Sequence, residues 1–171
     1  MHKALQLAVL TTGLAASALA GPTLACHEWV STPGSVFESL APLRLAAEAA
    51  YSPAGKGVAL AKLVELRADI KPGDPVSLLK AGYWAAVLND VRVSPDTDGG
   101  DMILRALALR PNDAEYEFMA ALAFADHDKT VFQQHWDRAQ HLAKPGSAAA
   151  QNLELFRPIL AERQANAERR H

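Results

Sequence analysis

The chain has 171 residues, of which 50% are apolar and 21% are charged, a composition typical of one globular domain with a buried core. Its formal net charge of -2 lacks the excess of basic residues with which proteins bind nucleic acid or an anionic membrane surface. We therefore expect a single domain and no nucleic-acid partner.

Residues 1–20 have the features of a secretory signal peptide. The short positive start MHK precedes an uncharged run, and Ala18-Leu19-Ala20 gives the small-x-small pattern that precedes signal peptidase cleavage. The run is short for a membrane-spanning helix, and no later stretch is long and apolar enough to span. We expect an exported protein, periplasmic or secreted, with no membrane span after cleavage.

An alternative cleavage position lies before Cys26, the only cysteine of the chain. The segment Thr23-Leu24-Ala25-Cys26 weakly resembles the lipobox of bacterial lipoproteins, in which the cysteine becomes the acylated N-terminus. That family prefers Leu where Thr23 stands and a small residue where Leu24 stands. We expect cleavage after Ala20 and a free thiol, with a lipid anchor at Cys26 as the alternative. A single cysteine permits no intrachain disulfide.

The remaining chain reads as helices in chain order. Residues 21–34 are rich in Gly, Pro, Thr and Ser, which predicts a flexible lead-in. Residues 35–171 show helical periodicity without a competing strand pattern, which predicts one all-α domain of antiparallel hairpins. The expected helices begin at the capping box Ser35–Glu38, with a break or kink at Pro42; at Ser52-Pro53; at Asp74-Pro75; at Asp101, after a loop over 94–100; at Ala114, behind the cap Asn112-Asp113; at Lys129; and behind the cap Ser147.

Two prolines indicate a repeat. Pro111 and Pro145 are 34 residues apart, and each ends one helix shortly before the next begins. Thirty-four residues is the period of the tetratricopeptide repeat, a helix-turn-helix unit that closes with proline. Over 75–145 the chain resembles this family, although no tryptophan opens either repeat; an unrelated helical bundle is the alternative. The matching positions are Ala106, Leu107 and Pro111 at the end of one repeat, Ala121 and Phe124 in the next first helix, and Gly82 one repeat earlier.

The resemblance implies a short right-handed solenoid with a C-terminal capping helix. In this family the concave groove, lined by the first helix of each pair, typically binds a peptide or a partner's helix. For that groove we predict Lys80, Tyr83, Tyr116 and Glu117. Tyr83 and Trp84 are adjacent and point about 100° apart on a helix, which predicts one buried and one near the surface.

Three sets of side chains have ligand types for metal ions but not the spacing. The histidines are separated by eight and six residues, the cysteine set consists of adjacent residues, and the aspartates lack the glycine and glutamate of an EF-hand loop. We expect no metal and no cofactor. The sets are His127, His135 and His141; Cys26, His27 and Glu28; and Asp96, Asp98 and Asp101.

The sequence has no glycine-rich phosphate loop, no GxSxG elbow and no HExxH motif, so we predict that the protein is not an enzyme. The favoured interpretation is a module that binds a protein or peptide partner. A structural subunit of a cell-envelope complex is the first alternative, and a large exposed apolar patch would indicate it. An unrecognised enzyme or small-ligand carrier is the second, and an enclosed pocket with convergent polar groups would indicate it.

Overall fold

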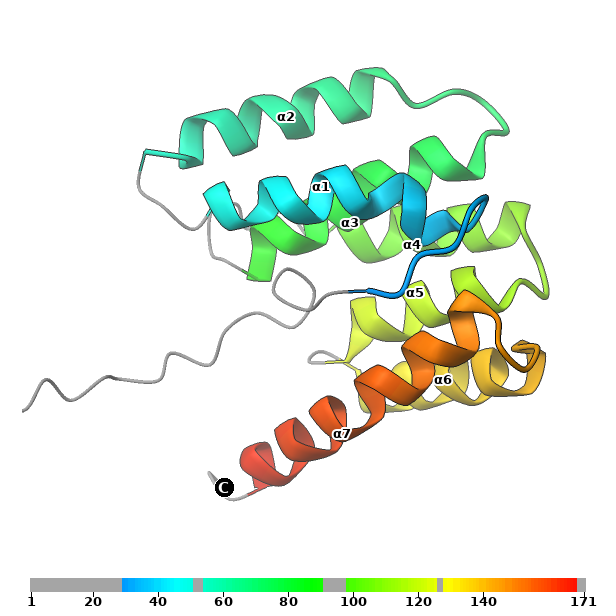
Figure 1. The fold of residues 1–171 in the computed structure, drawn as a ribbon. Helices are drawn as coiled ribbons and strands as arrows, with labels where there is room; N and C mark the ends of the chain where they lie inside the picture. The colour runs from blue at the N-terminus through cyan, green and yellow to red at the C-terminus, as the bar shows by residue number, and fades with distance from the viewer. Residues whose placement is uncertain (1–28, 51–53, 91–97, 126–127, 169–171) are drawn as a thin grey trace, which may run out of the picture.

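The computed structural model describes residues 29–50, 54–90, 98–125 and 128–168. These residues form seven α-helices and no strand, which confirms the all-helical prediction (Figure 1). Within these ranges no helix combines the length and the apolar character that crossing a membrane requires. The helices are α1 (Val36–Ala50), α2 (Lys56–Ala68), α3 (Pro75–Asp90), α4 (Asp98–Leu109), α5 (Ala114–Phe124), α6 (Lys129–Leu142) and α7 (Ala148–Glu168).

The same kind of turn precedes α1, α3, α5 and α7. Each has a proline, then a residue with φ between 62° and 81°, then the residue that caps the helix. Proline presets the first φ of a type II turn, and glycine or asparagine accepts the positive φ that follows. These four helices begin at the same edge of the molecule, on the right in Figure 1. The turns are Pro33-Gly34-Ser35, Pro72-Gly73-Asp74, Pro111-Asn112-Asp113 and Pro145-Gly146-Ser147.

The predicted caps at Asp74, Asp113 and Ser147 are confirmed. Each side-chain oxygen accepts a hydrogen bond from a backbone N–H of the first turn, at 3.0, 3.0 and 3.2 Å respectively. At α1 the capping box is altered, because the Glu38 carboxylate accepts from the backbone N–H of Gly34, at 2.8 Å. Local side-chain bonds of this kind satisfy donors that a helix leaves free at its start.

Two predicted boundaries are wrong, and of the break or kink predicted at Pro42 the break does not occur. α1 continues through Pro42 without ending, because Pro42 is exposed and the backbone carbonyl that loses its donor can face water. α2 begins at Lys56 and not at the predicted Ser52-Pro53, and residues 51–53 lie outside the described ranges. α4 begins at Asp98, so the predicted loop over 94–100 ends earlier than expected.

Two glycines lie where α3 and the first turn of α4 meet. A Cβ added to Gly82 in α3 would lie 2.9 Å from the backbone oxygen of Gly99, and one on Gly99 would lie 2.7 Å from the nitrogen of Ala86. The backbones of α3 and α4 therefore touch, which only glycine at these positions allows. Gly82, which the sequence analysis names as a position of the repeat pattern, is therefore a point of close contact between two helices.

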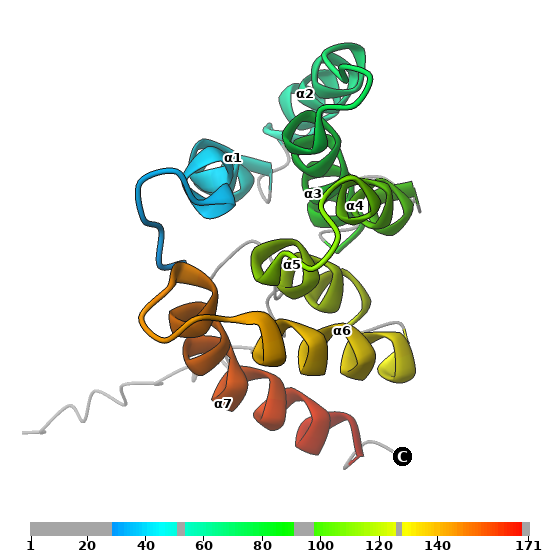
Figure 2. The same cartoon turned by 90° about the vertical axis from the view of Figure 1, so that its right-hand side faces the viewer.

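The first hairpin is built differently from the other two. α3 packs closely on α4, and α5 on α6, whereas α1 and α2 touch each other little. Both instead rest on α3, and α1 also reaches α5 (Figure 2). The first hairpin is therefore splayed, with α3 beneath the gap.

Aromatic rings join the first hairpin to the rest of the core. Phe118 of α5 has no exposed surface and lies at their centre. Its ring centroid is 5.6 Å from Phe37 of α1, 5.4 Å from Phe156 of α7 and 6.0 Å from Trp136 of α6. These distances suit the edge-to-face and offset contacts that aromatic rings prefer. One continuous core therefore connects α1 with α5, α6 and α7.

Candidate functional site

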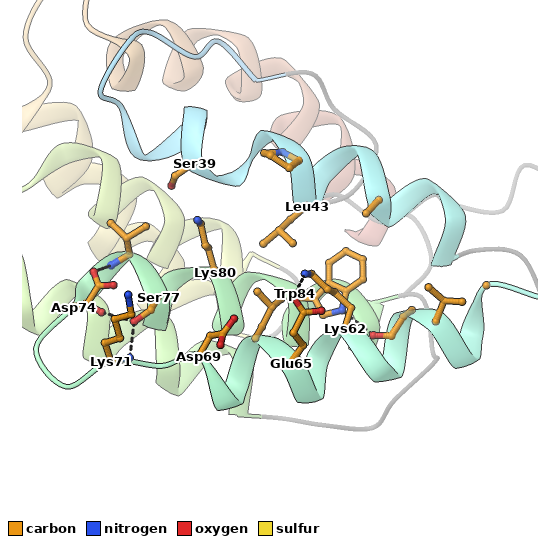
Figure 3. A pocket seen from close by; sticks show the side chains of 17 residues that line it. Ser39, Leu43, Lys62, Glu65, Asp69, Lys71, Asp74, Ser77, Lys80 and Trp84 are labelled. Carbon is orange, nitrogen blue, oxygen red and sulfur yellow. Dashed lines mark hydrogen bonds and ion pairs between the residues drawn. The ribbon is translucent and has the colours of Figure 1, made fainter.

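The splayed first hairpin leaves an open groove of about 780 Å³ between α1 and α2 (Figure 3). Its floor is apolar and consists of Leu43 of α1, Leu66 of α2 and Trp84 of α3. The Trp84 indole N–H donates to the backbone oxygen of Ala59, at 2.9 Å. Because this N–H is the only polar group of the indole and is already bonded, the part of the ring that lines the groove is apolar, although only 1% of the Trp84 surface is exposed.

The side walls of the groove are exposed. Val58 of α2 lines it and keeps 73% of its surface exposed. Pro42 and Ala46 of α1 line the opposite wall and are also exposed. The volume is in the range of small-molecule pockets, but the groove is open along its walls and does not enclose its contents.

Charged side chains of both signs surround this apolar floor. Three lysines and three carboxylates line the groove, so its net charge is balanced. Lys62 and Glu65 form an ion pair with each other, and Asp74 caps α3. The charged residues are Lys62, Lys71, Lys80, Glu65, Asp69 and Asp74.

Lys80 of α3 is one of the charged residues that line the groove. It is half-buried, and within the described ranges its ammonium pairs with no carboxylate. Figure 3 shows it extending from α3 toward Ser39 of α1. The Ser39 hydroxyl donates to the backbone oxygen of Val36, at 2.7 Å. The Lys80 ammonium can therefore pair with an anionic group of a bound partner.

A second hollow of about 450 Å³ shares Ser39 and Val76 with the groove and continues it toward α5. Tyr116 lines this hollow, and burial raises its pKa to about 12, so its hydroxyl stays neutral. Glu115 also lines it and accepts a hydrogen bond from the backbone N–H of Val36, at 2.6 Å. Burial raises the pKa of the Glu115 carboxyl above its ordinary value of 4.5.

The four residues predicted for a groove are not brought together. Lys80 lies in the groove, and Tyr116 lies in the adjoining hollow with 4% of its surface exposed. Tyr83 and Glu117 have no exposed surface. Trp84 is buried as well as Tyr83, so the prediction that one of the pair lies near the surface is wrong. Trp84 is a groove residue that the sequence analysis missed, although its i,i+4 spacing from Lys80 places both on one face of α3.

Glu117 has a different role. Its Oε2 is 2.6 Å from Nδ1 of His135, and its Oε1 is 3.0 Å from Nε of Arg138 without the alignment of a hydrogen bond. Both basic residues belong to α6, and His135 is itself buried. The cluster therefore ties α5 to α6 inside the second close hairpin.

Among the residues that the structure describes, the candidate metal ligands do not come together. Cys26, His27, Glu28, Asp96 and His127 lie outside the described ranges. Of the others, His135 is bound to Glu117, Asp98 pairs with Arg67 at 3.1 Å, and His141 and Asp101 are exposed. The described residues contain no group of three or more side chains that could hold a metal ion.

Comparison of the chain with protein-family models, with curated proteins and with solved structures finds no match. Any assignment to the tetratricopeptide-repeat family therefore stays a prediction from the spacing of its prolines and helices.

Proposed function

We propose that the protein is an exported binding module that holds an amphipathic helix of a partner protein in the groove between α1 and α2. The observation that carries this proposal is the splayed first hairpin. α3–α4 and α5–α6 close upon themselves, whereas α1 and α2 leave an apolar gap between them. A helix with one apolar face is the element that fills such a gap.

The lining fits this occupant in chemistry as well as in shape. Leu43, Leu66 and Trp84 would bury the apolar stripe of the partner helix, at positions i, i+3 or i+4, and i+7. Lys80 would pair with an acidic side chain near the middle of that helix. The mixed charges at the edges would fix its register without strong long-range attraction. Binding requires no covalent step.

The architecture that we propose around this groove is a short right-handed solenoid of the tetratricopeptide type, with α7 as its C-terminal cap. The turn that recurs before α1, α3, α5 and α7 supports a repeating hairpin unit. Export is supported by the signal-peptide features of residues 1–20, which lie outside the described ranges.

A second candidate is a structural subunit that packs permanently against another chain. The observation that favours it is Val64 of α2, which is 70% exposed and does not line the groove. An interface there would use the outer face of the same helix.

Val58 and Val64 offer a matched pair of variants. Both are exposed valines of α2, but only Val58 lines the groove. We expect Val58→Glu to abolish capture of the partner from the native cell envelope, because it places a charge against the apolar face of the bound helix. Val64→Glu should capture the partner as well as the parent chain does. Mass spectrometry of the captured proteins makes the comparison, after circular dichroism shows equal helicity.

Loss of the partner with Val64→Glu but not with Val58→Glu would move the interface to the outer face and favour the structural subunit. The same proteins captured by all three chains would exclude the groove as the binding site.

A further inference from the structure

The first described residues lie in the molecule as a peptide ligand would. The backbone N–H of Val30 donates to Oδ1 of Asn152, and Nδ2 of Asn152 donates to the backbone oxygen of Val30, both at 2.8 Å. Asn152 belongs to α7 and has no exposed surface. One side-chain amide thus holds both polar groups of one residue, as a neighbouring strand would. Since these bonds reach only the backbone, the clamp is indifferent to the side chain it holds.

An aromatic site lies beside this clamp. The ring of Trp29 meets Phe37 of α1 at 5.6 Å and Tyr83 of α3 at 5.2 Å, both edge to face. Phe37 and Tyr83 are fully buried, whereas Trp29 is half-buried. The lead-in that the sequence predicts to be flexible is therefore held at residues 29 and 30, by contacts from three different helices.

Trp29 does not fit the aromatic site in every respect. The indole nitrogen of Trp29 is buried and finds no hydrogen-bond partner among the described residues. An N–H buried in this way weakens binding, on the order of tenfold, relative to a ring that has none. A segment with phenylalanine in this place has no such N–H and avoids this cost.

We propose that Phe37, Tyr83 and Asn152 form a second binding site, for an extended segment of another protein with an aromatic residue followed by an aliphatic one. Trp29 and Val30 fill this site within the chain and compete with that segment. The site is distinct from the groove between α1 and α2, and the proposal does not depend on the function of that groove.

The test uses the full chain and three synthetic hexapeptides. HEWVST reproduces residues 27–32, HEFVST replaces the tryptophan, and HEAVST removes the ring. The variant Trp29→Ala empties the aromatic site. The readout is the side-chain amide signal of Asn152 in proton–nitrogen NMR spectra, which reports on the clamp itself.

HEWVST should bind Trp29→Ala at least about tenfold more tightly than the parent, in which the tethered segment competes at an effective concentration near millimolar. HEFVST should bind at least as tightly as HEWVST, and HEAVST at least about tenfold more weakly. Adding Asn152→Leu to Trp29→Ala should abolish binding of HEWVST and HEFVST; because this variant lacks the Asn152 amide, its binding is followed by the backbone amide signals of α7.

If Trp29→Ala is partly unfolded, saturating HEFVST should restore its helicity and its Tm toward the parent values. Absence of both rescue and an Asn152 shift overturns the proposal, as does equal affinity of the three peptides. A concentration-dependent dimer of the parent that Trp29→Ala abolishes would assign the site to a second copy of this chain, and would overturn its assignment to another protein.

Discussion

Glu117 shows how one residue can be misjudged from its place in a helix. It is a charged residue in the first turns of α5, and the sequence analysis placed it in a solvent-facing groove. The structure buries it completely and balances it with His135 and Arg138 of α6. Its partners lie 18 and 21 positions further along the chain, so no local pattern reveals them.

The cluster predicts a large effect on stability. Glu117→Ala should lower the free energy of unfolding by about 3–5 kcal/mol, because it leaves basic groups next to a buried gap. Glu117→Gln, which keeps the volume and one acceptor for His135, should cost less. Urea unfolding of both variants at neutral pH measures the difference. Equal losses would show that the charge, and not the packing, accounts for the effect.

Glu115 predicts a dependence of stability on pH. Burial raises the pKa of its carboxyl in the folded chain, so the folded state holds this proton more tightly than the unfolded state does. The contribution of Glu115 is therefore fully present below its unfolded pKa and is lost as the pH rises through the folded pKa. Glu115→Gln should be less sensitive to pH than the parent from about pH 4 upward. Thermal unfolding across this range checks the sign, and a steeper loss in the variant would contradict it.

At the scale of elements, the contact between α3 and α4 depends on glycine. Gly82→Ala should destabilise the protein by about 1–3 kcal/mol, because the new Cβ would lie 2.9 Å from backbone and side-chain atoms of α4. Gly57→Ala in α2 is the matched control, since its Cβ would meet nothing within 4 Å. That change should be neutral or stabilise by up to about 1 kcal/mol. Urea unfolding of the two variants compares them directly, and equal effects would refute the close contact as the cause.

The sequence predicts well what is decided locally. The caps at Asp74, Asp113 and Ser147 need only their own turn, and helical periodicity is sufficient to identify all seven helices. It fails where distant parts decide. The close contact of Gly99 in the first turn of α4 with Gly82, for example, joins two different helices, and no local pattern reveals it.

The groove could not be predicted for the same reason. Its existence depends on how far α1 stands from α2, and that separation is set by the contacts of α1 with α3 and α5. The sequence analysis identified Lys80 from its position in a first helix. It could not find Leu43 and Leu66, because an apolar residue that lines a groove and one that fills a core give the same periodic pattern.

At the scale of the whole molecule, some helices pack through residues close in sequence and others through residues far apart in sequence. The pairs α3–α4 and α5–α6 are made by residues close in sequence, whereas α1 is held by aromatic contacts that reach α5 and, through Phe118, α7. The groove is lined on one side by α1, the helix that these distant aromatic contacts hold in place. A loss of packing around Phe118 would therefore disturb the groove, although none of its lining residues is changed.

The two hydrogen bonds between Val30 and Asn152 join positions 122 residues apart. The inner hairpins can form as soon as their own residues have been synthesised, but this closure must wait for α7. On a ribosome, or in any process that delivers the chain from its N-terminus, Val30 therefore emerges long before the side chain that holds its backbone. A product truncated before α7 would retain the hairpins α3–α4 and α5–α6 but would lack the Asn152 amide that holds Val30. The placement of Val30 therefore depends on the helix that is synthesised last among those described.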